Sequence, residues 1–380
     1  MRIAIEALGI GQPGGGRTAT LVMLQSLLNV DSTHPTHQYD IWLTSPEPDL
    51  IAPHGNMRQH ILPMRQRFLA RLALQALLPA QVRRDAVALV HFAKNLTVAV
   101  PTQTVVTVYD LSTVVYSQMF PASDRLYWQH IQPRALRRAN HLIAISQRTA
   151  DDLVQHYGIA ANKISLVYPS CQPTYRPHSA GEIEMARQQL KLPENYVLHV
   201  GAISPKKNLT TLLKAFALAR QRGYSGHLVL AGPRYVKLRD EDLPTLAAEL
   251  GIADAVLFTG AVPEADLPAL YAGASLFVFP SLYEGFGLAP LEAMSCGVPT
   301  IVAAAGSTPE VVGQNGLIAR NPTDPQELAE LMLSVLLHPS AAAHWSALNL
   351  QRAKMFNSEA SAHKTLSIYE SLLPLNPQPL

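Results

Sequence analysis

Residues 276–302 read LFVFPSLYEGFGLAPLEAMSCGVPTIV, a stretch that contains a strand, a loop with two glycines, a helix and a second strand. Leu276–Phe279 is a short apolar run suited to a buried parallel strand. A helix follows the loop, because Pro290 suits a first helical turn and Gly297 suits the left-handed residue after a helix ends. The predicted helix therefore begins beyond the carboxyl end of a parallel strand, with its unpaired amides directed toward the loop.

The loop and the start of this helix predict an anion-binding site. Unpaired N–H groups and the helix dipole favour negative charge, and the predicted donors to a phosphate are the amides of Gly285, Phe286, Gly287 and Leu288. Glu284 in the loop and Glu292 in the first turn add two carboxylates, with seven residues between them. Each alone has an ordinary explanation, as a solvated loop acid or as a complement to the dipole. Together with a phosphate site they favour a sugar nucleotide, whose hydroxyls donate hydrogen bonds to carboxylates.

The two glutamates, with EGFGL at 284–288, AMSCGVP at 293–299 and S-x-P-E at 307–310, resemble the E-x7-E signature of retaining glycosyltransferases of the GT-B fold, in glycosyltransferase family 4. The resemblance extends over nearly the whole chain. It implies an α/β protein of the GT-B fold, with two Rossmann-like domains whose parallel sheets face each other across a cleft. It also implies that Glu284 holds hydroxyls of the transferred sugar and that Glu292 holds those of the ribose.

The length of 380 residues indicates two domains of ordinary size. A segment with several prolines after residue 168 marks the linker. We expect an N-terminal Rossmann-like acceptor-binding domain at 1–175 and a C-terminal Rossmann-like nucleotide-sugar-binding domain at 176–356. A C-terminal helix at 357–380 is expected to cross back to the first domain, as in similar proteins.

Composition narrows the class of protein. The net charge of +2 argues against a nucleic-acid-binding protein, and the sequence has no stripe of aromatic and basic residues. Cys171 and Cys296 lack metal-ligand spacing and are typical of reduced thiols in a cytosolic protein. The N-terminus predicts a strand rather than a signal peptide, and no apolar run reaches the ~18 residues that span a bilayer. We therefore expect a cytoplasmic protein.

Apolar runs predict the strands, and glycine, proline and capping residues separate them from helices. In the first half, strands are expected at 2–7, 39–43, 59–62, 88–92, 104–109, 142–145 and 164–168. In the second half, they are expected at 196–200, 227–230, 256–258, 276–279 and 300–302. Caps are expected at Thr18, Ser146 and Asn208, and the expected helices include 19–28, 209–221, 239–250, 264–272, 325–337 and 358–373. This alternation indicates parallel sheets.

The loop after the first strand is rich in glycine. The dinucleotide-binding fingerprint G-x-G-x-x-G is formally satisfied by Gly9, Gly11 and Gly14. Pro13 lies inside this match, and no acid is clearly placed to hold a ribose, so a dehydrogenase is the weaker interpretation. The family resemblance implies instead that this loop contacts the donor phosphates and the acceptor, through Gly14, Gly15 and Gly16.

The strand at 104–109 ends in Tyr-Asp-Leu, where many relatives have His-Asp-Leu. In the family that histidine faces the donor sugar, and Tyr109 occupies its position here. A phenol donates one hydrogen bond but is a poor base at neutral pH, because its reference pKa is about 10. We assign Tyr109 and Asp110 to the site, Asp110 as a polar wall or an acceptor contact. A packing role for Tyr109 stays open.

The second domain opens with a strand and the loop GAISPKKN at 201–208. Lys206 and Lys207 stand just before a helix, where the dipole disfavours cations, so they predict a bound anion. Two solvated lysines are the alternative. Relatives carry a basic residue early in this loop and a lysine at its end, both on the donor diphosphate. Lys207 matches the second, Ala202 replaces the first, and PKKN resembles the family's mannosyltransferase-like members.

Three further residues complete the predicted donor site. Gly201 opens the lysine loop and belongs to the donor site by the same resemblance. Arg234 and Val262 follow the ends of two predicted strands. By resemblance, these strand ends border the nucleotide base, which backbone groups would recognise there.

The segment Met64–Arg84 is amphipathic and basic, with arginines at Arg65, Arg67, Arg71, Arg83 and Arg84. Such arginines are able to meet anionic lipid headgroups while leucine and phenylalanine side chains lie in the membrane interface. The protein would then be peripheral at the inner face of a membrane. A core-packed helix with a solvated basic face accounts for the same pattern, and we favour it.

These features predict a retaining, metal-independent glycosyltransferase. Lysines and loop amides would neutralise charge on the leaving diphosphate, and no D-x-D motif stands at a strand end to hold a metal. The expected donor is GDP-mannose, with a UDP-linked sugar as the alternative, and the acceptor is a hydroxyl of a glycan, a lipid-linked or another molecule. No convincing nucleophile is evident, and the resemblance implies front-face transfer. A noncatalytic sugar-nucleotide-binding protein and a GT-B epimerase stay open.

Overall fold

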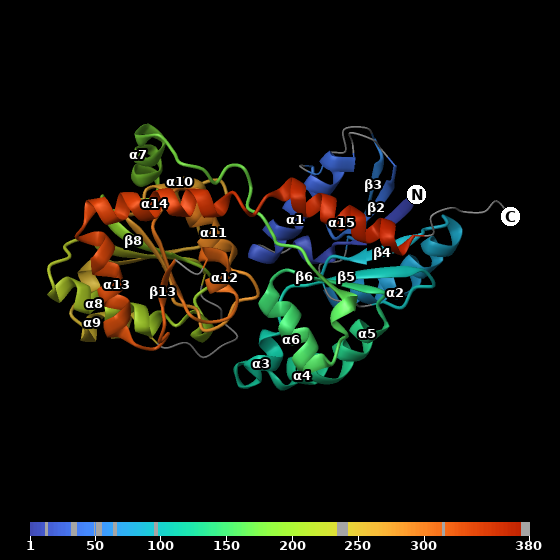
Figure 1. Ribbon diagram of the computed structural model, residues 1–380, viewed down its shortest axis with the longest axis horizontal. Helices are drawn as coiled ribbons and strands as arrows, with labels where there is room; N and C mark the ends of the chain where they lie inside the picture. Colours follow the sequence, from blue (N-terminus) through green and yellow to red (C-terminus); the bar gives the residue numbers. More distant parts are fainter. Residues whose placement is uncertain are drawn as a thin grey trace. The chain divides into compact units, whose positions relative to one another are not determined.

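The structure is a computed structural model that describes residues 1–11, 14–31, 36–48, 50, 55–63, 67–94, 98–233, 242–313 and 316–373. These residues form two compact units, each with its own parallel sheet (Figure 1). Unit 1 comprises Met1–Ser170 together with the chain from Phe356 onward, and unit 2 comprises Cys171–Met355.

Unit 1 is built on a seven-stranded sheet in the order β3-β2-β1-β4-β5-β6-β7, in which every neighbouring pair is parallel. Apolar side chains cover both of its faces, as expected for a parallel sheet between helices. The strands are β1 (Arg2–Glu6), β2 (Gln38–Leu43), β3 (Met57–Ile61), β4 (Leu89–Phe92), β5 (Gln103–Val108), β6 (His141–Ala144) and β7 (Ile164–Leu166).

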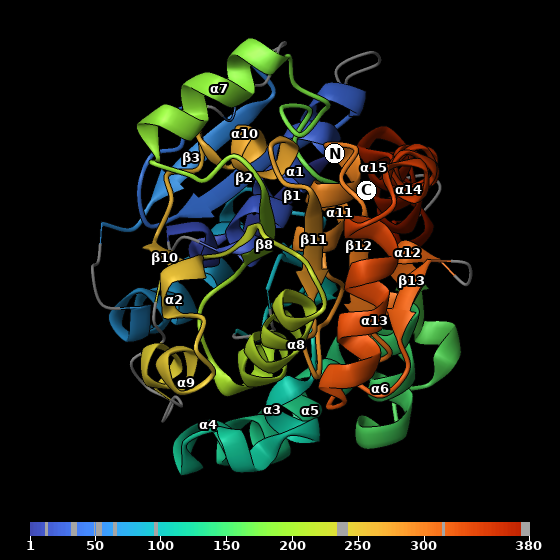
Figure 2. The same cartoon turned by 90° about the vertical axis from the view of Figure 1, so that its left-hand side faces the viewer.

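Unit 2 contains a six-stranded parallel sheet in the order β10-β9-β8-β11-β12-β13 (Figure 2). The prediction of two Rossmann-like parallel sheets is therefore confirmed, although the last strand was not expected. The strands are β8 (Tyr196–Val200), β9 (His227–Ala231), β10 (Val256–Gly260), β11 (Leu276–Phe279), β12 (Thr300–Ala303) and β13 (Leu317–Ala319).

Helices connect most of these strands along the chain. In unit 1 they are α1 (Gly15–Asp31), α2 (Arg67–Arg84), α3 (Ser112–Val115), α4 (Ala122–Leu126), α5 (Gln132–Arg138), α6 (Gln147–Tyr157) and α15 (Ser358–Leu372). In unit 2 they are α7 (Ala180–Gln189), α8 (Leu209–Gln221), α9 (Leu243–Glu249), α10 (Leu267–Ala272), α11 (Leu288–Ser295), α12 (Thr308–Val312), α13 (Pro325–Leu336) and α14 (Pro339–Ala353). Within the described ranges, no helix is both long enough and apolar enough to cross a membrane.

The helices of unit 1 cover opposite faces of its sheet. Side chains of α2, α5 and α6 share one apolar cluster with one face of the strands. Side chains of α1 and α15 share a second cluster with the other face. The last helix of the chain therefore packs beside the first, although they are separated by more than 300 positions (Figure 1).

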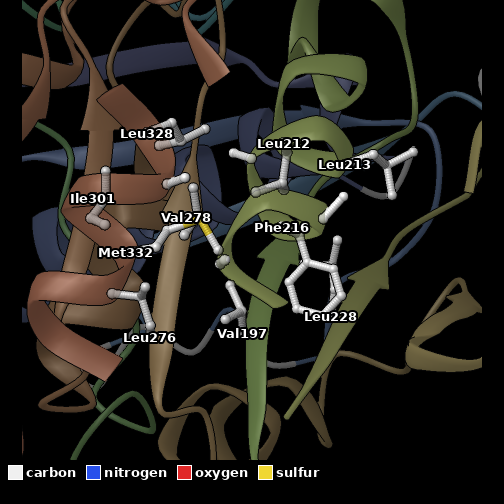
Figure 3. Close-up of a cluster of buried hydrophobic side chains, with 14 of the residues drawn as sticks. Val197, Leu212, Leu213, Phe216, Leu228, Leu276, Val278, Ile301, Leu328 and Met332 are labelled. Atoms are coloured by element: carbon white, nitrogen blue, oxygen red, sulfur yellow. The ribbon is translucent and has the colours of Figure 1, made fainter. Parts of the chain in front are cut away.

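The core of unit 2 lies between its sheet and the helices α8 and α13 (Figure 3). Complete burial of an aliphatic or aromatic side chain of this kind contributes about 1.5–3 kcal/mol. The side chains that meet there, each at most 2% exposed, include Val197, Leu212, Phe216, Leu276, Val278, Ile301, Leu328 and Met332.

Two of the predicted helix caps, Thr18 and Ser146, belong to unit 1. The expected cap at Thr18 is wrong, because α1 begins at Gly15 and the Gly14 carbonyl already accepts the amides of Arg17 and Thr18. The cap at Ser146 is confirmed, since its Oγ accepts the Thr149 amide at 3.0 Å.

A buried hydrogen-bond chain ties α15 to the sheet of unit 1. His91 Nδ1 lies 2.6 Å from the Tyr369 hydroxyl and Nε2 lies 2.8 Å from Thr107 Oγ1. Burial lowers the pKa of His91 to about 3, so the ring is neutral. Tyr369→Phe leaves one ring nitrogen unpaired and is expected to lower the free energy of unfolding by about 1–3 kcal/mol in urea titration. His363→Ala, an exposed position of the same helix, should change it by less than about 0.5 kcal/mol.

Candidate active site

The strand order of unit 2 places two loops side by side. The order reverses between β8 and β11, which are paired neighbours (Figure 2). Ligands of open α/β sheets bind at such a reversal, beyond the carboxyl ends of the strands. The turn Pro205–Lys207 follows β8 and the loop 280–287 follows β11. The Leu282 amide joins them by donating to the Lys206 carbonyl at 2.9 Å.

Lys206, Lys207 and Glu284 meet at this reversal, and we refer to these three residues as the lysine–glutamate cluster. Lys207 Nζ donates to Glu284 Oε1 at 2.8 Å, and Lys206 Nζ lies 3.5 Å from Glu284 Oε2. The Lys207 ammonium also lies over the ring of Phe279, 4.4 Å from its centroid. Three predicted site residues from two separate loops are therefore in direct contact.

Electrostatics keep the carboxyl of Glu284 ionised. Burial acts to raise its pKa, but the charges of Lys206 and Lys207 and the hydrogen bond from Lys207 outweigh burial and lower the pKa of Glu284 to about 2. The sequence predicts that the two lysines require an anion, and in this structure Glu284 is that anion. An anionic ligand at this reversal would compete with Glu284 for the same ammonium groups.

Asn208 holds the lysine turn against two other strand ends. Its backbone is left-handed, with φ 54° and ψ 41°, and it immediately precedes α8 as expected of a cap. Its side chain does not accept a helix amide, however, which corrects the simple capping role. Instead, Nδ2 donates to the carbonyls of Pro280 at 3.2 Å and Pro322 at 2.7 Å. The turn is thereby fixed to the loop that carries Glu284.

The segment after β12 holds the backbone of the loop that carries Glu284. The Ser307 hydroxyl lies 3.0 Å from the Glu284 carbonyl and 2.7 Å from the Phe286 carbonyl. A Cβ at Gly306 would lie only 2.5 Å from the Glu284 amide nitrogen, and its φ is +59°. Only glycine fits this approach. The S-x-P-E pattern signals Ser307, but sequence reasoning missed Gly306.

The helix α11 has the predicted ends. Gly287, with φ 105°, occupies the N-terminal cap position, and no side chain caps the helix there. Gly297 is left-handed with φ 78°, and its amide and that of Val298 donate to Met294 and Ala293, which closes the last turn. The start of α11 therefore presents backbone amides beside the lysine–glutamate cluster without a competing side chain.

Glu292 lies one turn into α11 and is 7% exposed. Its Oε2 accepts a hydrogen bond from the Tyr271 hydroxyl of α10 at 2.8 Å. The ring of Tyr175 packs edge-on against Tyr271, with 5.8 Å between centroids. Burial raises the pKa of Glu292 to about 7, against the bonds from these tyrosines. Among the described residues, Glu292 therefore bonds to tyrosines and not to the lysine–glutamate cluster.

Two other predicted donor residues lie at the same edge of the sheet. Gly201 follows β8 and lies close to the Lys207 side chain, since a Cβ built on Gly201 would stand 3.1 Å from Lys207 Cε. The backbone of Gly232, after β9, approaches the Gly201 carbonyl so closely that any side chain at position 232 would clash with it. Val262 follows β10 and is half-buried. Arg234 lies outside the described residues.

The predicted residues of unit 1 lie at the carboxyl edge of its own sheet. Gly15 and Gly16 are the first residues of α1, and the Gly16 carbonyl accepts the Thr20 hydroxyl at 2.8 Å. The Tyr109 hydroxyl lies 2.6 Å from Thr20 Oγ1. Because the Thr20 proton is directed to a carbonyl, Tyr109 donates its own proton to Thr20. Burial raises the pKa of Tyr109 to about 12, so it has no capacity as a base at neutral pH.

Asp110 and Lys94 complete this part of unit 1. Asp110 Oδ1 accepts the Ser112 amide at 2.9 Å and the Ser112 hydroxyl at 2.6 Å, so that oxygen orders the start of α3. Lys94 follows β4 and was missed by sequence reasoning. Its Nζ lies 5.9 Å from the Tyr109 ring centroid and 3.5 Å from where a Cβ on Gly16 would stand. Lys94 therefore adds a cation beside the glycine loop.

The described residues include no cluster of metal-ligating side chains, and neither cysteine forms a disulfide. No group of three or more His, Cys, Asp or Glu side chains there is placed to hold a metal ion. Cys171 and Cys296 are free thiols, as expected. Burial raises the pKa of Cys171 to about 11, so it is protonated at neutral pH.

Comparison with known proteins assigns the chain to a family. The model for Glycosyl transferases group 1 matches residues 182–350, and the model for Glycosyltransferase Family 4 matches residues 35–173. O-antigen chain mannosyltransferase B of Escherichia coli is 32% identical over 271 residues, which are 70% of this chain and 70% of that protein. The chain belongs to glycosyltransferase family 4.

Solved structures confirm the fold of this family 4 glycosyltransferase. Sucrose-phosphate synthase from Thermosynechococcus elongatus superposes with a TM-score of 0.77 at 23% identity, over 98% of this chain and 99% of that one. HepE from Anabaena, solved in complex with UDP-glucose, superposes with a TM-score of 0.74 at 23% identity, over 98% and 100% of the two chains. The prediction of the GT-B fold, and that of the family, are therefore confirmed.

Proposed function

We propose that this family 4 glycosyltransferase transfers a hexosyl group with retention, from a nucleotide diphosphate sugar to a hydroxyl of a glycan or lipid-linked acceptor. GDP-mannose is the favoured donor. The lysine–glutamate cluster at the strand reversal of unit 2 is the observation that carries the proposal, because it combines diphosphate-binding cations with a hydroxyl-binding carboxylate. Mannose is favoured because PKKN resembles the mannosyltransferase-like members of the family, and because the Escherichia coli relative is named a mannosyltransferase.

Donor binding replaces the two ion pairs of the lysine–glutamate cluster with two sets of ligand contacts. In the described structure Lys206 and Lys207 neutralise Glu284. A diphosphate that approaches the amides of α11 draws the ammonium groups to its oxygens, and Glu284 then accepts hydrogen bonds from sugar hydroxyls. Glu292 would hold the ribose hydroxyls. The lysines and amides supply the charge stabilisation for which other transferases use a divalent cation, so we propose transfer that requires no metal.

The proposed chemical step keeps the configuration of the anomeric carbon. The bond from that carbon to the diphosphate oxygen breaks, and a bond to the acceptor oxygen forms on the same face. The acceptor proton passes to the departing phosphate oxygen, so the step needs no protein nucleophile. Glu284 is not used as one, because in the proposed donor complex its carboxylate accepts hydrogen bonds from sugar hydroxyls.

The donor assignment is tested by thermal-shift measurements and turnover. GDP-mannose is expected to raise the melting temperature more than UDP-glucose or UDP-N-acetylglucosamine, and slow release of mannose to water is expected without acceptor. Equal or greater shifts with the UDP-sugars would contradict the donor assignment. Binding without any release or transfer would indicate the noncatalytic alternative, and interconversion of a free sugar nucleotide would indicate an epimerase.

We also propose a peripheral membrane contact through α2. One face of this helix is buried, at Ala70, Leu74, Leu78 and Val82, which agrees with core packing. Yet Leu69 and Leu77 are 46% and 44% exposed, and Arg83 and Arg84 are exposed at its end. Met64–Gln66, with Arg65, lie outside the described residues, as do the side chains of Arg67 and Arg71.

Vesicle flotation tests this contact. The protein is expected to float with vesicles of phosphatidylcholine and phosphatidylglycerol, and less with phosphatidylcholine alone, because each basic residue near an anionic surface contributes about 1 kcal/mol. The double substitution Leu69→Ser and Leu77→Ser should abolish flotation. Leu348→Ser, at an exposed leucine of unit 2, should leave it unchanged. Flotation that depends neither on lipid charge nor on these leucines would contradict the proposed membrane contact.

A further inference from the structure

His199 is a buried residue of β8 for which the proposed reaction has no role so far. It is 1% exposed, and its ring stacks on Phe279 with 5.5 Å between centroids and 16° between planes. Nδ1 lies 3.0 Å from the Val278 carbonyl oxygen. Because a carbonyl only accepts hydrogen bonds, Nδ1 carries a proton and donates it.

The second ring nitrogen of His199 has no partner. Burial, reinforced by the charge of Lys207, lowers the pKa of His199 to about 3, so the ring is neutral and Nε2 is an acceptor. This nitrogen is buried and makes no hydrogen bond in the described part of the chain. Unpaired buried acceptors are uncommon in native proteins, and each one calls for a specific explanation.

Gly201 lies close to both this nitrogen and the Lys207 ammonium. A Cβ built on Gly201 would lie 3.5 Å from His199 Nε2 and 3.3 Å from Lys207 Nζ. Both groups therefore border the same point, at which Gly201 places no side chain. Lys207 also lies over Phe279, the ring on which His199 stacks. The lysine–glutamate cluster thus has an unused acceptor within reach of its shorter ion pair.

We propose that His199 is a positioning residue for Lys207, whose ammonium donates to His199 Nε2 once a donor sugar occupies Glu284. This inference rests on the proposed function. In the described structure the Lys207 ammonium donates to Glu284 at 2.8 Å. When sugar hydroxyls take that carboxylate, one ammonium hydrogen needs a new acceptor, and Nε2 provides it.

A neutral imidazole suits this task for electrostatic reasons. It accepts one hydrogen bond from the ammonium and so orients the remaining N–H groups toward the diphosphate. Unlike a carboxylate, it adds no negative charge that would repel the diphosphate. The bond to Val278 fixes the tautomer, since it places the proton on Nδ1 and the lone pair on Nε2.

Two substitutions separate acceptance from packing. His199→Phe keeps a ring that stacks on Phe279 and removes the acceptor, whereas His199→Gln loses the ring and retains a side-chain oxygen that accepts. Turnover of GDP-mannose is expected to fall by about 10- to 100-fold in His199→Phe, as for the loss of a hydrogen bond to a charged group. His199→Gln should retain most of the wild-type kcat, and KM for GDP-mannose should change little in either variant.

A purely structural role predicts the opposite order, because glutamine loses the stacking that phenylalanine keeps. Equal kcat in both variants and the wild type, or a lower kcat in His199→Gln than in His199→Phe, would overturn the inference. Tyr196→Phe is the matched control, since it removes a different buried hydrogen bond from β8, that to the Leu270 carbonyl. It should lower thermal stability and leave kcat unchanged.

Nuclear magnetic resonance tests the same contact in the wild-type chain. With 15N-labelled histidine, the Nε2 resonance of His199, assigned by its absence in His199→Gln, should move to lower frequency when GDP-mannose is added. It should not move in Lys207→Ala. A resonance that stays in place at saturating GDP-mannose would overturn this inference and leave the proposed function standing. Failure of the wild type to bind any sugar nucleotide would overturn the proposed function, and the inference with it.

Discussion

Lys207→Ala is expected to lower the turnover of GDP-mannose by about 10²- to 10³-fold, the usual effect of removing one preorganised group that stabilises charge in a transition state. Negative charge grows on the diphosphate as its bond to the anomeric carbon breaks, so the ammonium binds the transition state more strongly than the ground state. KM for the donor should therefore rise much less than kcat falls. Single-turnover release of mannose, with donor binding by calorimetry, measures the two effects separately.

Matched lysines sharpen this test. Lys214→Ala removes the same charge from an exposed position of α8 and should leave turnover unchanged. Lys206→Ala should have a smaller effect than Lys207→Ala, because the Lys206 ammonium lies 3.5 Å rather than 2.8 Å from Glu284 and its side chain is 22% rather than 13% exposed. Turnover of Lys207→Ala within about twofold of the wild type would show that Lys207 does not stabilise the transition state.

The strands are the part of this fold that the sequence predicts best. A parallel strand is buried on both faces and therefore forms a continuous apolar run. Tyr196–Val200 and Leu276–Phe279 are predicted with their observed bounds. The strand β13 has only three residues, too few for a pattern. The helix α7 was also missed, although Ser179 and Glu182 form a capping box whose S-x-x-E spacing is visible in the sequence.

Contacts within the site follow from strand order, which no local pattern contains. Lys207 and Glu284 are 77 positions apart, and only the pairing of β8 with β11 brings their loops together. The sequence indicates that each binds a ligand, but not that they neutralise each other without one. Tyr271 and Lys94 belong to no motif, because a single residue at a helix face or strand end has no spacing to recognise.

Glu292→Gln is expected to weaken donor binding and, at pH 8, to stabilise the protein. The carboxylate would lose its charged hydrogen bonds to ribose hydroxyls, which corresponds to roughly 10- to 100-fold in the dissociation constant of GDP-mannose. The neutral amide retains an oxygen that accepts the Tyr271 hydroxyl, so the fold should persist. Calorimetry with GDP-mannose measures the loss, and Glu249→Gln, at an exposed position of α9, should bind normally.

The expected gain in stability follows from the direction of the pKa shift. Burial raises the pKa of Glu292 from 4.5 to about 7, so between these values the folded chain holds a proton that the unfolded chain has released. Stability from this group is therefore complete below about pH 4.5, falls as the pH rises through 7, and stays low above it. Each unit of pKa corresponds to about 1.4 kcal/mol, which sets an upper limit of about 3 kcal/mol on the loss.

Glutamine has no proton to release, and it should remove this pH dependence. Urea titrations are expected to give equal unfolding free energies for Glu292→Gln and the wild type at pH 4.5, and a higher value for the variant at pH 8. A variant less stable than the wild type at pH 8 would mean that ionised Glu292 is well accommodated in the folded chain. If Glu292→Gln is more stable than the wild type at pH 8 but binds the donor more weakly, unit 2 keeps a buried carboxylate for its ligand at the expense of its own stability.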